Sequence, residues 1–252
     1  MAIYGLGFGQ NRLLRDLPSE DRVGVDADGE EVELTLSQIL AMPGEAIDHV
    51  YFPIRGFISI IAAVDGDRNL EVGLVGTDGM LGTSLALGVN VSPLKALVQG
   101  EGRALRLTTA AFTRLYSKSA ELRTQVGRYL YVLTSQTART AACTRFHLVE
   151  ARLARWLLMT QDHAGSNKFR VTHAFLAWML GVRREGVTEA ASKLQRQHLI
   201  SYNRGNVTIL DTAALRHLAC SCYAADKVAY LKLFPNGPAK RPRAKQATKP
   251  AR

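Results

Sequence analysis

The chain has 252 residues, of which 47% are hydrophobic and 21% are charged, and its formal net charge is +10. This length and composition predict one or two globular domains, and they exclude a peptide or an array of short repeats. Because the sequence has no run of about 20 apolar residues and no signal-peptide or lipidation pattern, we expect a cytoplasmic protein with no membrane partner.

Short β-prone runs fill residues 33–107. Turn signals such as Arg55-Gly56 and Asp65-Gly66 separate them at the intervals typical of an antiparallel sandwich or barrel, and the second of these is the best hairpin signal. The predicted strands are residues 32–36, 50–53, 57–63, 70–75, 96–99 and 104–107. These runs predict an N-terminal antiparallel β-roll of the jelly-roll type.

A jelly-roll can carry a histidine-rich metal centre, but residues 1–140 contain a single histidine, His49, and no cysteine. We therefore interpret His49 as a polar surface or edge residue. No serine, cysteine or carboxylate pair stands in a recognisable catalytic context, so the sequence predicts no enzyme activity. Cys143, Cys220 and Cys222 lack the second ligand pair of a structural zinc site, so we expect reduced thiols, no metal and no cofactor.

A helical pattern resumes near Thr109, and a longer run without proline extends from Ala120 toward Ala142. Within it, apolar residues recur in the alternating steps of four and three that are typical of a coiled-coil seam. The predicted dimer-interface residues are Leu122, Val126, Tyr129, Leu130 and Leu133. The alternative is that this stripe packs on its own β-domain, because seams this short are common.

A helix-turn-helix pattern follows a further helix that ends near residues 165–167. Thr172 is a candidate N-cap for a short amphipathic helix, and Gly181 suits the left-handed conformation that ends it. A second helix then opens at Arg183 and leaves a polar outer face. Apolar and β-branched runs on either side of residues 203–206 predict a β-hairpin wing after this helix.

The second helix of such a pair presents its N-terminal side chains to base edges in the major groove of DNA. The candidate base-reading residues are Arg184, Glu185, Thr188 and Glu189. The candidate phosphate contacts are Thr172, Arg183, Ser192, Lys193, Arg196 and Arg204. The alternative is a simple packing hairpin of two helices, against which the basic turn and the wing both argue.

Positive charge is concentrated in the second half of the chain. Residues 1–147 carry 14 Lys/Arg and 16 Asp/Glu, residues 148–234 carry 12 and 6, and residues 235–252 carry 6 and none. An acidic front and a basic back fit a sensor or assembly module joined to a polyanion binder. The last segment is rich in proline and poor in apolar side chains, so we expect a disordered tail, either a solubilising end or an arm that grips phosphates.

The order of β-roll, long helix and winged helix-turn-helix over residues 30–225 resembles the family of the cyclic AMP receptor protein and the fumarate and nitrate reduction regulator, the Crp/Fnr family. The strongest match is LGVRREGVTEAASKLQRQHLI. The resemblance implies that Arg184 and Glu185 read bases. Arg183 stands where the family usually has a phosphate-contacting serine or threonine, so the resemblance does not carry that contact over directly. A further family arginine is replaced by Glu189, so we expect a different preferred operator.

The resemblance also implies an effector pocket, but its cyclic-nucleotide signature is missing here. The family has a glycine-glutamate pair for the ribose and an arginine-serine pair for the phosphate, because a buried anionic diester needs a fixed cation. This chain has Gly79-Met80 and Leu94-Lys95 at those places, and it lacks the family's four-cysteine iron-sulfur arrangement. The chemistry and the existence of an effector stay open at this point, and cyclic AMP is not the expected ligand. The candidate pocket residues are Met80, Leu81, Gly82, Leu94 and Lys95.

These patterns together predict an α+β chain. The predicted segments are a β-roll sensor domain at 1–118, a dimerisation helix and hinge at 119–147, a winged helix-turn-helix domain at 148–234 and the basic tail at 235–252. We expect a bacterial transcription regulator that binds double-stranded DNA as a homodimer on a two-fold operator, with RNA polymerase as a further candidate partner. The rival interpretations are a small-molecule-binding β-barrel protein or enzyme with only non-specific polyanion binding, and a protein-interaction module.

Overall fold

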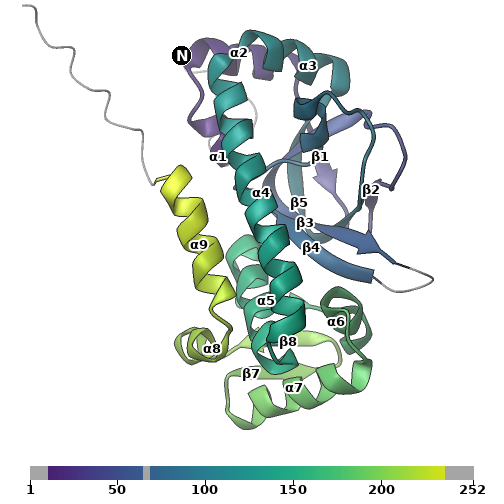
Figure 1. Cartoon of the computed structure of the whole chain (residues 1–252), viewed down its shortest axis with the longest axis vertical. Helices are drawn as coiled ribbons and strands as arrows, with labels where there is room; N and C mark the ends of the chain where they lie inside the picture. Colours follow the sequence, from purple (N-terminus) through teal and green to yellow (C-terminus); the bar gives the residue numbers. More distant parts are fainter. Residues whose placement is uncertain (1–10, 65–68, 236–252) are drawn as a thin grey trace, which may run out of the picture.

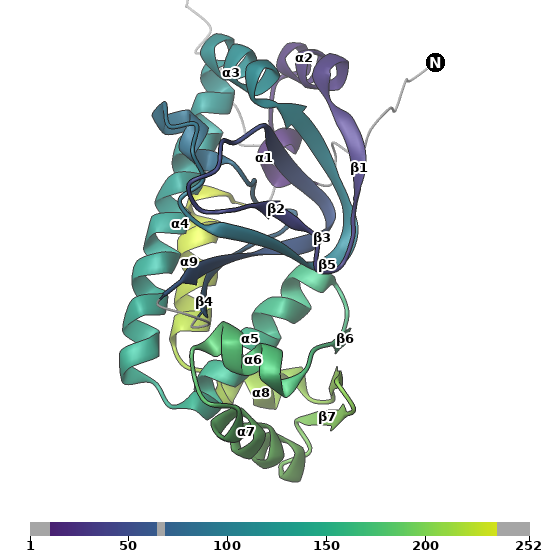
Figure 2. The same ribbon diagram turned by 90° about the vertical axis from the view of Figure 1, so that its right-hand side faces the viewer.

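The computed structural model describes residues 11–64 and 69–235, and the predicted basic tail lies almost wholly outside them. A long helix, α4 (Ala120–Phe146), runs alongside the N-terminal sheet and ends near the C-terminal helices (Figure 1). Turning the molecule by 90° shows the sheet and the small C-terminal domain stacked along the direction of this helix (Figure 2). The expected α+β architecture is therefore confirmed.

The N-terminal sheet is antiparallel and forms the predicted β-roll. Two short helices precede it, α1 (Arg12–Arg15) and α2 (Ser19–Asp28). The strand order is β1 (Glu30–Leu34), β5 (Lys95–Thr108), β3 (His49–Ala63) and β4 (Asn69–Val75), and β2 (Ile39–Ala41) also pairs with β5. The sequence patterns missed α1, α2, β2 and a 3-10 turn at Thr83–Leu87.

Two pairs of predicted strands are single long strands in the structure. The prediction of a turn at Arg55-Gly56 was wrong, because β3 continues through it with a shift in its pairing to β5. Gly56 has φ +80°, and a Cβ atom there would collide with the carbonyl of Gly100 on β5. Gly56 and Gly100 thus mark a bulge at which the backbones of β3 and β5 approach closely. The predicted β3–β4 hairpin is confirmed by its antiparallel register, although its turn, residues 65–68, lies outside the described residues.

Local signals mark the start of α4 and the end of the next helix, α5. The Ser119 hydroxyl accepts the N–H of Leu122 and caps α4 at its start, and Gly165, with φ +60°, follows the end of α5. The remaining elements are α3 (Thr109–Lys118), α5 (Val149–Ala164), β6 (Lys168–Arg170), α6 (His173–Leu180), α7 (Arg184–Arg196), β7 (Ile200–Asn203), β8 (Asn206–Ile209), α8 (Thr212–Leu218) and α9 (Cys222–Leu233).

The apolar core joins the predicted β-roll and the predicted C-terminal domain, which were expected to be separate segments. Ile61 and Leu97 of the β-roll belong to the same buried cluster as the helices of the C-terminal domain. In the other direction, α9 runs back beside α4 (Figure 1), and Tyr230 and Phe234 pack into the cluster beneath the β-roll. Residues 148–234 therefore include a last helix that packs against the front half.

A buried ion pair reinforces this junction. Asp226 of α9 accepts hydrogen bonds from Arg155 of α5 at 2.9 Å and from Arg139 of α4 at 3.1 Å. Arg155 and Asp226 are both buried, and burial raises the pKa of Asp226 while the two guanidinium groups oppose that rise. Three helices are thus joined through one carboxylate.

Candidate nucleic-acid interface

The first helix of the pair, α6, has the predicted ends. The Thr172 hydroxyl accepts the N–H of Phe175 at 3.1 Å, and Gly181 adopts the left-handed conformation, with φ +60° and ψ +43°. Leu176, Met179 and Leu180 are buried against the core, and Phe175 is partly buried beside them. The geometry that turns the chain from α6 into the next helix is therefore set locally, by a side-chain cap and a glycine.

The second helix, α7, buries one face and exposes the other. Its buried residues are the four predicted from their spacing: Val187, Ala190, Ala191 and Leu194. Arg183 stands at the N-cap position, and Arg184 and Glu185 follow it with exposed side chains. The helix lies at the end of the molecule that is remote from α2 and α3 (Figure 1). Its N-terminal side chains are thus free to enter a groove.

Thr188 has partners within the protein. Its hydroxyl donates to the carbonyl of Arg184 at 3.0 Å and lies 3.0 Å from Nδ1 of His173. A hydroxyl has one proton, so His173 must donate through Nδ1–H, which leaves its Nε2 as an acceptor. Burial, and then the charge of Arg184, lower the pKa of His173 and favour this neutral form. The ring of His173 stacks on Tyr202 at a centroid distance of 4.3 Å.

The other predicted DNA-contact residues differ in their exposure and in their partners within the protein. The ammonium of Lys193 lies 3.4 Å from Glu150 and 3.7 Å from Glu189, so two candidate DNA contacts neutralise each other in part. Ser192 is half-buried, whereas Arg196 is exposed. Because exposed ion pairs contribute little, Lys193 can exchange its carboxylates for a phosphate.

The wing has the predicted hairpin and one strand more. Arg204 and Gly205 form its tip, with φ +47° and +82°, and the Arg204 side chain is exposed. The additional strand β6 pairs with β8 and contributes the exposed residues Lys168 and Arg170. These two cations were not among the predicted contacts, although the alternation Lys-Phe-Arg-Val is a strand signal. They extend the basic surface beside the wing.

The predicted dimer seam needs correction. Leu122, Val126 and Tyr129 are buried inside the protomer, in the cluster that packs against α1 and the β-roll. The stripe therefore faces its own domain, which is the alternative that the pattern left open. Leu130 and Leu133 are half-buried and line a cavity instead.

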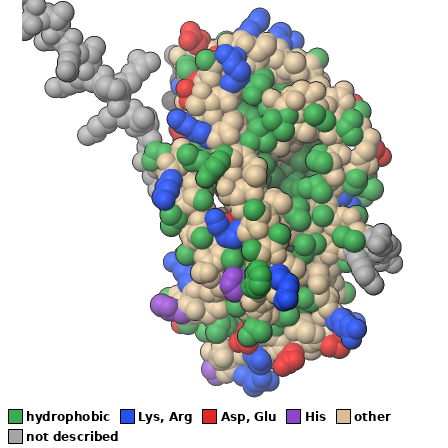
Figure 3. All heavy atoms as spheres, in the orientation of Figure 1, with side chains coloured by type: hydrophobic (Ala, Val, Ile, Leu, Met, Phe, Trp, Pro, Cys, Tyr) green, Lys and Arg blue, Asp and Glu red, His purple; other side chains and the backbone are tan. Residues whose placement is uncertain are grey.

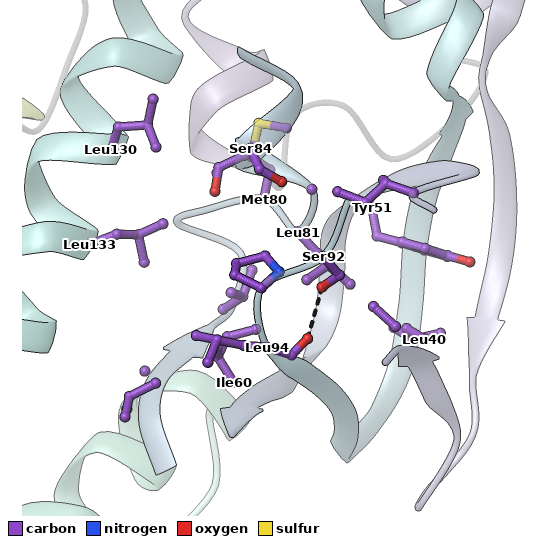
Figure 4. A pocket seen from close by; sticks show the side chains of 18 of the residues that line it. Leu40, Tyr51, Ile60, Met80, Leu81, Ser84, Ser92, Leu94, Leu130 and Leu133 are labelled. Atoms are coloured by element: carbon purple, nitrogen blue, oxygen red, sulfur yellow. Dashed lines mark hydrogen bonds between the residues drawn. The ribbon is translucent and has the colours of Figure 1, made fainter. Parts of the chain in front are cut away.

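This cavity has a volume of about 700 Å³ and lies between the β-roll and α4. Its mouth is the hollow beside α4, rimmed by hydrophobic side chains (Figure 3). Leu130 and Leu133 extend from α4 toward Met80 and Ser84 (Figure 4). The cavity is large enough for a drug-sized molecule, and such a molecule would touch both the sheet and the long helix.

Four of the five candidate pocket residues, Met80, Leu81, Gly82 and Leu94, line this cavity. The fifth, Lys95, is not among the lining residues, because its ammonium lies 5.6 Å from the centre of the Trp178 ring on α6. His49, half-buried at the start of β3, is a further lining residue.

The charged side chains around the cavity are acidic. Among the lining residues that the structure describes there is no lysine or arginine, and Glu45 and Asp48 supply two carboxylates.

Within the described part of the chain, no helix is both long and apolar enough to cross a membrane.

A family model and the sequences of known proteins both match parts of this chain. Residues 151–218 match the family described as the Crp-like helix-turn-helix domain. The chain is 26% identical over 182 residues to the CRP-like protein Clp of Xanthomonas campestris pv. campestris, a match that covers 67% of this chain and 78% of that protein.

Two solved structures share the fold. The c-di-GMP-responsive global regulator CLP of Xanthomonas campestris superposes with a TM-score of 0.63 at 21% identity, over 77% of this chain and 100% of that one. A CRP/FNR-family transcriptional regulator from Thermus thermophilus superposes with a TM-score of 0.63 at 21% identity, over 75% of this chain and 98% of that one.

Proposed function

We propose that the chain is a transcription regulator of the Crp/Fnr family that binds a specific two-fold DNA operator as a homodimer, on the basis of its Crp-like helix-turn-helix match and its similarity to CRP-like regulators. The observation that carries this proposal is the exposure of Arg184 and Glu185 at the start of α7, between the turn at Gly181 and a basic wing. An arginine fork matches the two acceptors of guanine, and a glutamate accepts from cytosine. Arg183, Arg196 and Arg204 surround them as phosphate contacts.

Selection of bound sequences from a random duplex pool tests both the readout and the symmetry. We expect an inverted repeat whose half-sites are about 34 Å apart, because two winged domains related by a two-fold axis reach successive major grooves on one side of the duplex. A pool that stays random after repeated selection contradicts the proposal.

The dimer that this requires is best supported by the exposed face of α4. Gly127, Tyr131, Thr134 and Ala138 are exposed and recur in steps of four, three and four. Tyr131 has 63% of its surface exposed, which is unusual for a large aromatic side chain on a helix. We place the helix–helix contact here because small residues in this spacing let two helices approach closely.

A charge at the centre of this face tests the contact. We expect Tyr131→Glu to convert the dimer into monomers in sedimentation equilibrium, because the two-fold axis would bring two like charges together. Lys118→Glu, at the exposed end of α3, is the control and is expected to leave the dimer intact. A Tyr131→Glu protein that remains dimeric excludes this face.

We further propose that the cavity between the β-roll and α4 holds a neutral, largely apolar effector. The related CLP structure is described as responsive to c-di-GMP, but the two phosphates of that molecule need fixed cations. The described lining residues supply carboxylates instead. We therefore expect neither c-di-GMP nor cyclic AMP to bind here.

Titration with the neutral apolar dye N-phenyl-1-naphthylamine tests the nature of the cavity. We expect saturable binding that Leu133→Trp weakens at least about 10-fold, because the indole fills space that the dye needs. Leu87→Trp adds the same ring at an exposed position outside the cavity and is the control. Dye binding that both variants affect equally, or tight binding of either nucleotide, contradicts this assignment.

A further inference from the structure

Four metal-ligating side chains from two distant parts of the sequence meet at the junction of α4 with α9. Cys143 and His147 lie at the C-terminal end of α4, and Cys220 and Cys222 lie where the chain passes from α8 into α9. Their ligand atoms all lie within 4.8 Å of one another. The spacing of these residues in the sequence does not indicate that the two segments meet, so His147 was not among the predicted ligands.

The distances match those around a single tetrahedral ion. Cys143 Sγ lies 3.5 Å from Cys220 Sγ, and Cys222 Sγ lies 3.6 Å from Nδ1 of His147. Zinc bonds of about 2.3 Å to sulfur and about 2.0 Å to nitrogen, at tetrahedral angles, require separations of roughly 3.8 Å and 3.5 Å. A disulfide would need the sulfurs at about 2.05 Å. A cluster of several iron atoms would hold its thiolates farther apart than one ion does.

We propose that Cys143, His147, Cys220 and Cys222 form a closed tetrahedral site for one zinc-like divalent ion. Sulfur and imidazole ligands in this geometry select zinc over the hard cations calcium and magnesium, which prefer oxygen. All four coordination positions come from the protein, which is the pattern of a structural site.

The backbone arranges these ligands from both sides. Cys143 and His147 are four residues apart and therefore lie on one face of the end of α4, where the N–H of His147 donates to the carbonyl of Cys143 at 3.1 Å. The N–H of Cys220 donates to the carbonyl of Ala151 on α5 at 3.4 Å, and the N–H of Tyr223 donates to the carbonyl of Cys220 at 3.1 Å. The ligand positions are thus tied to α4, α5 and α9.

Burial and charge also suit an ion. All three thiols are buried, and His147 is half-buried at the edge of the cluster. A divalent ion with three thiolates and one neutral imidazole carries one net negative charge, and the buried guanidinium of Arg155 is close enough to interact with the Cys143 thiolate.

Cobalt substitution of the full-length protein tests the site without DNA, so the result is independent of the proposed operator binding. The protein is reduced, stripped of metal with a chelator and titrated with Co²⁺ without oxygen. We expect one equivalent to bind with the intense visible bands of tetrahedral cobalt and a thiolate charge-transfer band, and Zn²⁺ to displace it. Because metal binding adds to folding stability, Zn²⁺ is also expected to raise the melting temperature.

Variants assign the ligands. We expect Cys143→Ser and Cys222→Ser to weaken Co²⁺ binding by more than about 100-fold, since removal of a residue that merely orients a ligand already costs roughly 10–100-fold. His147→Cys keeps four ligands and is expected to retain binding with a stronger thiolate band. His217→Ala removes an exposed histidine of the neighbouring helix and is expected to change nothing.

Three results would overturn the proposal. The first is less than stoichiometric binding, the second an octahedral cobalt spectrum, and the third binding that the cysteine variants leave unchanged. A Cys143–Cys220 disulfide in protein purified without reductant, detected by alkylation and mass spectrometry, would overturn it as well.

Discussion

Glu71 is a buried carboxyl group at the contact between the β-roll and the C-terminal domain. It lies on β4, accepts a hydrogen bond from Ser59 at 2.6 Å, and accepts another from the indole N–H of Trp156 on α5 at 2.9 Å. Burial raises its pKa from 4.5 to about 7, and the two hydrogen bonds and Arg155 only partly oppose that rise. The substitution Glu71→Gln keeps an acceptor for Trp156 and removes the ionisation.

The raised pKa of Glu71 determines whether the stability of the protein rises or falls with pH. The folded protein keeps the proton of Glu71 up to about pH 7, whereas the unfolded chain loses it near pH 4.5. Between these values the folded state binds more protons, so stability falls as the pH rises. With these two pKa values, the contribution of Glu71 to the free energy of unfolding decreases by about 2.5 kcal/mol between pH 5 and pH 8.

Urea unfolding of both proteins across this pH range measures the effect. We expect the stability of Glu71→Gln relative to the wild type to increase by about 2.5 kcal/mol from pH 5 to pH 8, and to level off above that. Glu101→Gln, at an exposed position on strand β5 of the same sheet, is the control and is expected to show no such trend. A stability difference that does not change with pH refutes the assignment of a neutral, buried Glu71.

Three further predictions concern the helix junction, the base-reading helix and the tail. Asp226→Ala leaves Arg155 buried without its carboxylate, so we expect the free energy of unfolding, measured by heat or urea, to fall by about 3–5 kcal/mol. The control Lys227→Ala removes a surface pair with Asp162 and should cost less than about 1 kcal/mol. Equal losses in the two variants contradict a stabilising role of the buried ion pair. Arg184→Ala is expected to weaken binding to the selected operator by about 1–3 kcal/mol and to random duplex very little, and similar losses on both DNAs remove its base-reading role. Deletion of residues 236–252, which carry six Lys/Arg, is expected to weaken binding and flatten its salt dependence, and an unchanged slope dismisses the phosphate-gripping arm.

Local rules predicted the helix-turn-helix closely. The Thr172 cap, the left-handed Gly181 and the four buried residues of α7 each depend on a few neighbouring residues, and each is present in the structure. The wing hairpin followed from the turn at Arg204-Gly205 for the same reason. Periodicity and capping depend on residues that are close in the sequence, so they can be predicted from a short stretch of it.

Features that depend on contacts across the chain were predicted less well. The apolar seam of α4 gives the same pattern whether it packs on a second protomer or on its own β-roll, and burial of Leu122 and Val126 shows that it does the latter. The sequence of β3 predicted two strands because glycine at position 56 is a turn signal. In the structure, Gly56 instead allows the backbone of β5 to approach closely. Likewise, Cys143 and Cys220 are 77 residues apart and meet only because α9 returns along α4.

Competition between two duplexes measures whether the exposed face of α7 binds DNA in a sequence-specific way. The affinity of the wild-type protein is measured for the selected operator and for a scrambled duplex of the same length and composition, at several salt concentrations. We expect the operator to bind at least about 10³-fold more tightly than the scrambled duplex at physiological salt. A ratio near one at every salt concentration would contradict this expectation, because phosphate contacts alone would then explain all of the binding.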